Sequence, residues 1–232
     1  DVCSSDLVVD GKGWLHLPKR VHDGLDRLVS VEATRTGAEL RGDRIDTRAV
    51  DGVAATRREP GAPLLRWEGL RCERHGALVF TGVSHHVRQG DRTVVRGVSG
   101  SGKTTLLEVL AGLRRPVEGG VLWSEDVANA TAAMFSMDLP FAQHSTLREL
   151  VSDTTLLAAL QLEELANREL RTLSGGQQQR ALLAIAVAHP APLILLDEPT
   201  SALDEANAIR VVDAINSSAK TFVMAKIGRA HV

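Results

Sequence analysis

The spacing of apolar residues along the chain changes near residue 64. Before that point, four apolar residues after Pro18 recur at helical spacing: Val21, Leu25, Leu28 and Val29. A stretch dense in Gly, Pro, Arg and Asp then runs from Thr36 to Pro63. A helix that begins after a proline, followed by a stretch of this composition, predicts a helical extension and a linker.

From residue 64 onward, short apolar runs alternate with glycine-containing turns. The pattern predicts strands over 64–70, 77–80, 92–96, 132–136, 193–196 and 221–225. It predicts helices over 104–113, 177–188 and 205–215, with helical periodicity over 146–171. Leu193–Leu196 is apolar at every position, which is typical of a strand buried on both faces. This order of strands and helices predicts an α/β fold with a parallel sheet.

A glycine-rich loop joins the strand predicted at 92–96 to the next helix. Gly97 to Thr104 reads GVSGSGKT and fits the P-loop pattern G-x-x-x-x-G-K-[ST]. Glycines let successive N–H groups converge on phosphate oxygens, and the helix N-terminus adds the positive end of its dipole. Lys103 would supply a charge for the β- and γ-phosphates, and Thr104 a hydroxyl for Mg²⁺. A functionless glycine-rich turn is the alternative, which the strand–loop–helix context disfavours.

Two carboxylates, Asp197 and Glu198, follow the apolar run Leu193–Leu196. Parallel sheets place their ligands at the carboxyl ends of strands. Asp197 is therefore predicted to hold Mg²⁺, usually through water, and Glu198 to polarise the attacking water as a general base. Acidic residues after a strand are also common at surface turns, so this assignment depends on the P-loop.

A second glycine pair precedes the helix predicted at 177–188. Ser174 stands at the N-cap position, followed by Gly175, Gly176 and Gln177. This arrangement makes a second anion-facing helix N-terminus, although alone it could be a cap with a flexible lead-in. One nucleotide does not need two such sites from one chain. The pair therefore indicates that each site serves a different nucleotide, in a dimer.

Together these motifs resemble the ATP-binding cassette (ABC) family over about residues 64–225. Gly97–Thr105 is similar to its Walker A motif and Leu173–Arg180 to its signature. Leu193–Pro199 resembles its Walker B motif with the catalytic glutamate, and Ser201–Asp204 its D-loop. The resemblance implies an α/β, RecA-like P-loop NTPase core with a parallel sheet, an antiparallel β subdomain and a short helical subdomain.

The resemblance also implies an ATPase at the cytoplasmic face of the cell membrane, with Mg²⁺ at its site. Two cassettes would face head to tail with ATP between one Walker A motif and the other signature, and hydrolysis would move a transmembrane domain. The implied catalytic residue is Glu198, and the implied metal positions are Thr104, Asp197 and Asp138. The implied nucleotide-binding positions are Gly97, Ser99, Gly100, Ser101, Gly102, Lys103, Thr104, Thr105, Ser174, Gly175, Gly176 and Gln177.

Several features depart from the family pattern. Residues 138–149 resemble the exporter run Q-D-P-F-x-x-x-G-T-x-R-E, which puts Asp138 at the Q-loop glutamine position, with a side chain that is charged and one methylene shorter. No aromatic residue for adenine follows the first strand, where Arg74 or His75 could stack or simply form a solvated turn. The switch histidine is not found after 221–225. Only 35 residues separate Asp138 from Leu173, which indicates a short helical subdomain.

The two ends of the chain correspond to complementary strands of one oligonucleotide. Back-translating residues 227–232 as ATC GGA AGA GCA CAC GTC gives the reverse complement GAC GTG TGC TCT TCC GAT, which encodes residues 1–6. This oligonucleotide also resembles a sequencing adapter. We therefore expect residues 1–7 and 226–232 to be non-native, 8–63 to be a helical extension and linker at the tail of a transmembrane domain, and 64–225 to be the ABC domain.

Composition narrows the functional classes further. The 27 Lys and Arg residues nearly balance the 29 Asp and Glu residues, a net charge of −2 that gives no electrostatic case for nucleic acid. Outside residues 1–7, Cys72 is the single cysteine, which excludes a disulfide framework and fits a reducing compartment. No run approaches the roughly 18 apolar residues that a membrane helix needs.

The leading hypothesis is the cassette of an exporter-type transporter that couples ATP hydrolysis to substrate movement. A soluble ABC ATPase in translation or DNA repair is one alternative, and it predicts a second cassette or a coiled coil nearby. A degenerate cassette that binds ATP but hydrolyses it poorly beside an active partner is the other. Asp138 motivates this reading, whereas Glu198 and the intact Ser174–Gly176 argue against it.

Overall fold

The fold is described from a computed structural model that defines residues 61–97, 99–125, 132–136 and 144–227. The helix predicted after Pro18, nearly all of the linker and Asp138 lie outside these residues. The described part of the chain holds no helix that is both long and apolar enough to cross a membrane.

An antiparallel sheet forms one side of the molecule, in the order β2-β1-β4. Its strands are β1 (Pro63–Arg74), β2 (Ala77–Arg88) and β4 (Glu118–Trp123). His75 and Gly76 join β1 to β2 with φ of 52° and 77°, and a two-residue turn with both φ positive suits a tight hairpin. This sheet confirms the antiparallel subdomain that the resemblance implied.

Strand β4 is absent from the sequence prediction. It begins Glu118-Gly119-Gly120, and glycine disfavours strands because it has no side chain to pack. The structure shows why glycine is needed at Gly119. A Cβ added to it would lie 2.3 Å from the carbonyl oxygen of Glu68 on β1, so β4 could not approach β1 this closely.

The second sheet is parallel, in the order β3-β7-β6-β5. Its strands are β3 (Arg92–Gly97), β5 (Ala132–Phe135), β6 (Leu193–Asp197) and β7 (Thr221–Ile227). The parallel α/β core is thus confirmed. β7 continues two residues past Ala225 into the segment expected to be non-native. Because strand pairing uses backbone groups that any residue provides, this extension does not test where residues 226–232 come from.

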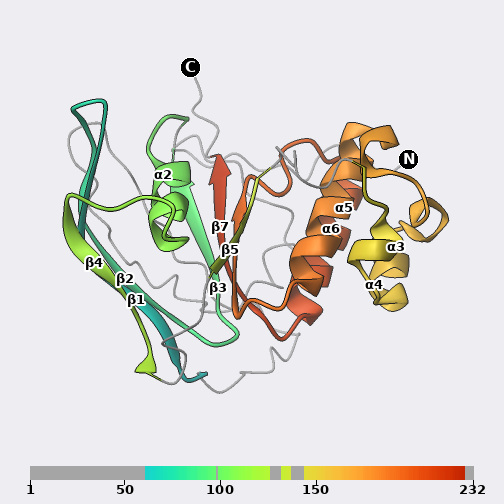
Figure 1. Cartoon of the computed structure of the whole chain (residues 1–232), viewed down its shortest axis with the longest axis horizontal. Coiled ribbons are helices and arrows are strands. Elements are labelled where there is room, and N and C mark those ends of the chain that lie inside the picture. Colours follow the sequence, from blue (N-terminus) through green and yellow to red (C-terminus); the bar gives the residue numbers. More distant parts are fainter. Residues whose placement is uncertain (1–60, 98, 126–131, 137–143, 228–232) are drawn as a thin grey trace, which may run out of the picture.

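Helices lie on both faces of the parallel sheet (Figure 1). α2 (Lys103–Leu110) lies between the two sheets, and its buried side chains share a core with the antiparallel sheet. α5 (Gly175–Ala188) and α6 (Glu205–Ser217) cover the opposite face. Successive residues of β6 therefore point into different cores: Leu193 and Leu195 toward α2, and Ile194 and Leu196 toward α5.

The periodic stretch over 146–171 folds as short segments instead of long helices. They are α3 (Leu147–Leu150), α4 (Thr154–Ala159) and the 3₁₀ turns η2 (Glu163–Leu165) and η3 (Leu170–Thr172). Asp153 caps the start of α4, because its carboxylate accepts a hydrogen bond from the backbone N–H of Leu156 at 3.0 Å. This is the short helical subdomain that the sequence predicted.

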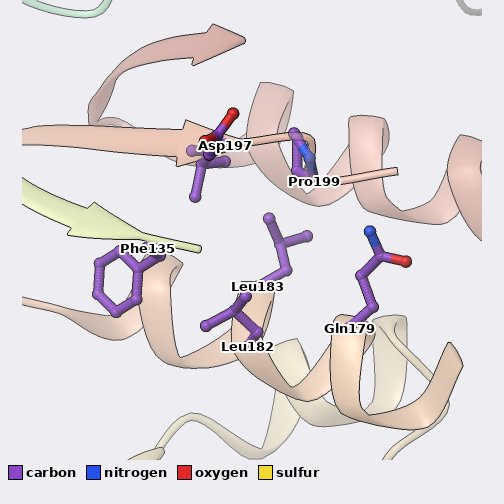
Figure 2. A pocket seen from close by; sticks show the side chains of 7 residues that line it. Phe135, Gln179, Leu182, Leu183, Asp197 and Pro199 are labelled. Atoms are coloured by element: carbon purple, nitrogen blue, oxygen red, sulfur yellow. The ribbon is translucent and has the colours of Figure 1, made fainter. Parts of the chain in front are cut away.

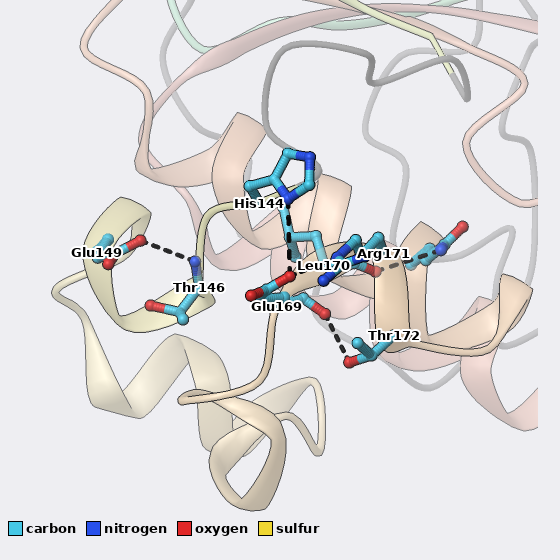
Figure 3. Close-up of polar contacts among 8 residues, drawn as sticks. His144, Thr146, Glu149, Glu169, Leu170, Arg171 and Thr172 are labelled. Atoms are coloured by element: carbon cyan, nitrogen blue, oxygen red, sulfur yellow. Dashed lines mark hydrogen bonds and ion pairs between the residues drawn. The ribbon is translucent and has the colours of Figure 1, made fainter.

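Backbone bonds fasten the beginning of this subdomain to its end, close to the start of α5. Leu170 N–H donates to the carbonyl of Ser145 at 3.0 Å, and Arg148 N–H donates to that of Ala166 at 2.8 Å. Figure 3 shows the side chains around this junction, where the Glu169 carboxylate lies 3.8 Å from His144 Nδ1. The segment that follows the Q-loop region is thereby tied to the residues that lead into α5.

Candidate nucleotide site

The loop predicted to bind phosphate, called the phosphate-binding loop below, lies between the end of β3 and the start of α2. Gly102 caps α2 with a φ of 91°, a backbone conformation that side chains rarely tolerate. A Cβ added there would also lie 2.4 Å from Val79 Cγ1 and 3.2 Å from Phe80 Cδ1. β2 therefore supports the loop from beneath, and Gly102 is required both by its φ and by this close approach.

Lys103 lies inside the loop and is only 7% exposed. Its ammonium donates to the carbonyl oxygen of Gly97 at 3.0 Å, so the side chain folds back across the loop. Burial lowers the pKa of Lys103, while the charges of Glu198 and Asp197 act in the opposite direction. Both predicted acidic residues therefore lie near enough to Lys103 for their charges to act on its pKa.

Thr104 and Asp197 meet directly, although they are 93 residues apart. The Thr104 hydroxyl donates to Asp197 Oδ2 at 2.6 Å, which joins the start of α2 to the end of β6. These hard oxygen donors fit Mg²⁺, which usually takes one or two protein oxygens and completes its shell with phosphates and water. Within the described residues no group of three or more His, Cys, Asp or Glu side chains could form an all-protein metal cage.

The other loop positions differ in exposure. Ser99 and Gly100 are exposed, and Gly100 has a φ of 78°. Thr105 is 3% exposed and faces the core. Ser101 Oγ is buried and has no hydrogen-bond partner in the part of the chain that the structure describes. A ligand oxygen can satisfy such a hydroxyl, so it fits the predicted binding of phosphate.

Glu198 follows Asp197 with a left-handed backbone, at a φ of 53°. Residues other than glycine seldom adopt this conformation, and it persists where surrounding contacts fix it. Here the Glu198 N–H donates to the carbonyl of Ala225 at 3.0 Å. The Glu198 carbonyl accepts bonds from the Ser201 N–H at 3.2 Å and the Ser201 hydroxyl at 3.1 Å.

The signature residues open α5. Ser174 is the N-cap, and its backbone N–H donates to Gln177 Oε1 at 2.9 Å. Within the described part of the chain, a Cβ added to Gly175 would meet nothing within 4 Å, and one added to Gly176 would make only ordinary contacts at 3.9 Å. Neither glycine has a positive φ. Among the residues that the structure describes, packing and backbone conformation therefore require glycine at neither position.

A small pocket lies beside the acidic pair, between α5 and the ends of β5 and β6 (Figure 2). Its lining residues are Phe135, Gln179, Leu182, Leu183, Leu196, Asp197 and Pro199. Most of these side chains are apolar, and none belongs to the phosphate-binding loop. The pocket is therefore not the nucleotide site, although the two share one residue, Asp197.

The structure places some of the site residues predicted from the sequence and not others. The structure brings Lys103, Thr104, Asp197 and Glu198 together. Asp138 lies outside the described residues. His75 forms the turn between β1 and β2, which agrees with the solvated-turn alternative and leaves adenine stacking as a prediction.

One contributor to the site was missed from the sequence. Gln179 is 1% exposed and contacts the turn that carries Glu198. The available signal was a polar residue on the buried face of an otherwise alanine- and leucine-rich helix.

A phosphate-binding loop beside a carboxylate at the end of a parallel strand is the arrangement of P-loop NTPases, and the chain has the fold of that class. Residues 80–201 match the sequence family described as ABC transporter. The chain belongs to the ABC transporter family, whose ATP-binding cassettes bind and hydrolyse ATP.

The relatives include both large and small proteins. The mycobactin import ATP-binding/permease protein IrtB of Mycolicibacterium thermoresistibile is 36% identical over 188 residues, which are 69% of this chain and 32% of IrtB. The cytochrome c biogenesis ATP-binding export protein CcmA of Pseudomonas savastanoi pv. phaseolicola is 36% identical over 165 residues, 62% of this chain and 78% of CcmA. The chain thus spans about a third of the length of one relative and more than three quarters of the other.

A solved structure described as a metal-chelate type ABC transporter in an inward-facing conformation superposes with a TM-score of 0.58. It is 32% identical and covers 71% of this chain and 73% of its own. The ADP conformation of the ATP-binding cassette MJ1267 superposes with a TM-score of 0.60 at 22% identity, covering 73% of this chain and 82% of its own, and supports the fold alone.

Proposed function

We propose that this chain is the motor domain of a membrane transporter, acting at the cytoplasmic face of the membrane on an attached transmembrane domain. The observation that carries the proposal is the 2.6 Å bond between the Thr104 hydroxyl and Asp197. This bond places Asp197, and Glu198 beside it, next to the loop that is predicted to bind the phosphates of ATP. The relatives named for import and export support the transport role.

Each residue has a distinct task in the proposed reaction. Lys103 and the loop N–H groups bind the phosphates and stabilise the negative charge that develops on them. Thr104 and Asp197 would hold Mg²⁺, with Asp138 as a further candidate ligand, and the ion would supply positive charge at the phosphates. Glu198 orients the attacking water and accepts its proton, so that ATP and water become ADP and phosphate.

The second partner in this proposal is another cassette, whose signature completes the site. α2 and α5 lie on opposite faces of the parallel sheet, so the phosphate-binding loop and the signature begin helices that do not share a face. Gly175 and Gly176 leave the N-terminus of α5 uncovered by side chains, and no packing contact among the described residues requires glycine there. Both observations support binding of ATP between the loop of one cassette and Ser174–Gln177 of the other.

Mg²⁺-dependent ATPase activity tests the proposed chemistry, using the chain with its genomic flanking sequence in place of residues 1–7 and 226–232. We expect Glu198→Gln to reduce turnover by about 10²-fold or more while ATP still binds, because only the general base is lost. Lys103→Ala should lose ATP binding as well. Turnover at the unmodified rate in Glu198→Gln would contradict the assigned base.

A degenerate cassette beside an active partner remains the second candidate, and Asp138 at the Q-loop glutamine position is the observation that favours it. This candidate predicts Lys103-dependent ATP binding without turnover. Replacing Asp138 with glutamine should then restore hydrolysis. If the unmodified chain already hydrolyses ATP, Asp138 is a tolerated variant and the motor function holds.

The genomic sequence upstream of Val8 separates the transporter from the soluble alternative. A transmembrane domain requires several apolar runs of about 20 residues each. A second cassette or a coiled coil in their place would instead indicate an ABC ATPase of translation or DNA repair.

A further inference from the structure

Gln179 is a buried polar residue whose carboxamide is bonded at both ends. Its side chain leaves α5 toward the turn after β6 and borders the small pocket beside Asp197 (Figure 2). Gln179 Nε2 donates to the carbonyl of Glu198 at 3.1 Å, and Gln179 Oε1 accepts from the Ala202 N–H at 3.0 Å. One side chain thus supplies the donor and the acceptor that hold the two ends of residues 198–202.

The turn that Gln179 holds carries the strained residue of the site. Glu198 keeps its left-handed φ of 53° because its N–H and its carbonyl are both occupied. Two of the donors to that carbonyl come from Ser201, which belongs to the same turn. Gln179 is the donor that comes from another element, so it alone among these contacts fixes the turn relative to α5.

We propose that Gln179 is a positioning residue: it fixes the direction of the Glu198 carboxylate and makes the catalytic turn move with the signature helix. The proposal rests on the proposed function, in which Glu198 is the general base. α5 begins at Gly175, so Gln179 lies three to four residues, about one helical turn, after the signature glycines. A displacement of the signature would therefore pull on Glu198 and Ala202 through bonds to their backbone.

The chemistry of the contact selects glutamine. Glutamate has the same length and keeps the acceptor for Ala202, but its carboxylate cannot donate to the Glu198 carbonyl. Methionine fills a similar volume and offers neither bond. Gln179→Met thus reports on the loss of both hydrogen bonds with little change in packing, whereas Gln179→Glu loses the donor and also buries a charge.

Steady-state ATPase kinetics on the full chain test the proposal. We expect Gln179→Met to lower kcat about tenfold, since small displacements of a catalytic group are costly, while KM for ATP changes less than twofold. Gln179→Glu should lower kcat at least as much, because it also buries a carboxylate against the Glu198 carbonyl oxygen. Val211→Ala, a buried substitution on α6, controls for loss of stability and should lower Tm without lowering kcat at a temperature where it is folded.

A double-mutant cycle separates positioning from general damage. Adding Gln179→Met to Glu198→Gln should cause no further loss of residual hydrolysis, because the group being positioned is already disabled. A second tenfold loss in that background, or an unchanged kcat in Gln179→Met alone, would overturn the proposal. If Gln179→Met does not fold, Gln179→Glu is subjected to the same cycle. Rapid turnover by Glu198→Gln itself would instead refute the proposed function, whatever Gln179 does.

Discussion

At the scale of single residues, two glycines of the phosphate-binding loop differ in what would oppose a side chain at their positions. Gly100 and Gly102 both have positive φ, but a Cβ would meet open space at Gly100 and Val79 at Gly102. The unfavourable φ alone costs roughly 1–2 kcal/mol for alanine. At Gly102 the clash adds to that cost and moves the start of α2.

We therefore predict that Gly102→Ala lowers both stability and ATP affinity more than Gly100→Ala does. Thermal denaturation would measure the first effect and titration with ATP the second. Gly100→Ala serves as the matched control because its strain comes from the backbone alone. Equal losses in the two variants would show that contact with β2 does not constrain the loop.

His85 makes stability depend on pH. Burial, and then the neighbouring charge of His86, lower the pKa of His85 to about 4, while Asp91 acts in the opposite direction. The unfolded chain binds a proton near pH 6.5, whereas folded His85 stays neutral until about pH 4. Its contribution is therefore complete above pH 6.5 and is lost as the pH falls toward 4.

Unfolding in urea at several pH values should show this loss. Between about pH 6 and pH 4 the free energy of unfolding should fall by up to about 1.4 kcal/mol per pH unit from His85 alone. His85→Phe keeps an aromatic ring beside Trp67 and should remove that part of the slope. An unchanged slope in His85→Phe would assign the pH dependence to other groups.

At the scale of elements, the C-terminal end of α6 depends on a buried arginine from β3. Arg92 is 5% exposed and donates to the carbonyls of Ile215 at 3.0 Å and Asn216 at 3.1 Å. The last carbonyls of a helix lack partners within the helix, and a positive charge there also suits the helix dipole. Arg92 thus ties α6 to the strand that precedes the phosphate-binding loop.

Arg92→Met should lower the free energy of unfolding by about 2 kcal/mol or more, because it leaves these carbonyls without a charged donor. Arg92→Lys keeps the charge but not the forked donors, so it should recover only part of the loss. Chemical denaturation of the three proteins would provide the comparison. Full recovery by lysine would show that charge alone accounts for the contact.

Most elements could be predicted from the sequence because their patterns are local. β6 follows from an unbroken apolar run, and the loop before α2 from its glycine and lysine spacing. β4 could not be predicted, since its Gly119 is explained only by the approach to Glu68. The segmentation of 146–171 depends on the cap at Asp153, which the apolar periodicity does not reveal.

In the site, too, local motifs could be predicted from the sequence, whereas contacts between distant segments could not. Lys103, Thr104, Asp197 and Glu198 lie in recognisable motifs, and a parallel sheet brings such motifs to one edge. Gln179 acts through contacts with residues 198 and 202, and no local pattern indicates that α5 packs against that turn.

At the scale of the whole molecule, the two hydrophobic cores share the parallel sheet. Neighbouring residues of β6 and β7 point alternately into the core around α2 and the core around α5. A loss of packing on one face therefore weakens the strands on which the other face depends. The described residues should unfold as one cooperative unit.

Ile194→Ala tests this coupling, because Ile194 is buried in the core beside α5. We expect a loss of about 2–5 kcal/mol. In a Trp14→Phe background, the remaining Trp67 and Trp123 report on the antiparallel sheet across the molecule. Their fluorescence transition should shift as much as the helical circular dichroism signal. A shift in the dichroism alone would show that the two cores unfold separately.

The position of β3 has a consequence for how the protein is made. Within the described chain, β3 lies at an edge of the parallel sheet and pairs with β7 alone. A ribosome releases β3 early and β7 more than a hundred residues later. The strand that leads into the phosphate-binding loop therefore has no sheet partner until nearly all of the domain has been translated. Nascent chains that stop before Thr221 should be unable to retain ATP, so nucleotide capture would mark the emergence of β7 from the ribosome.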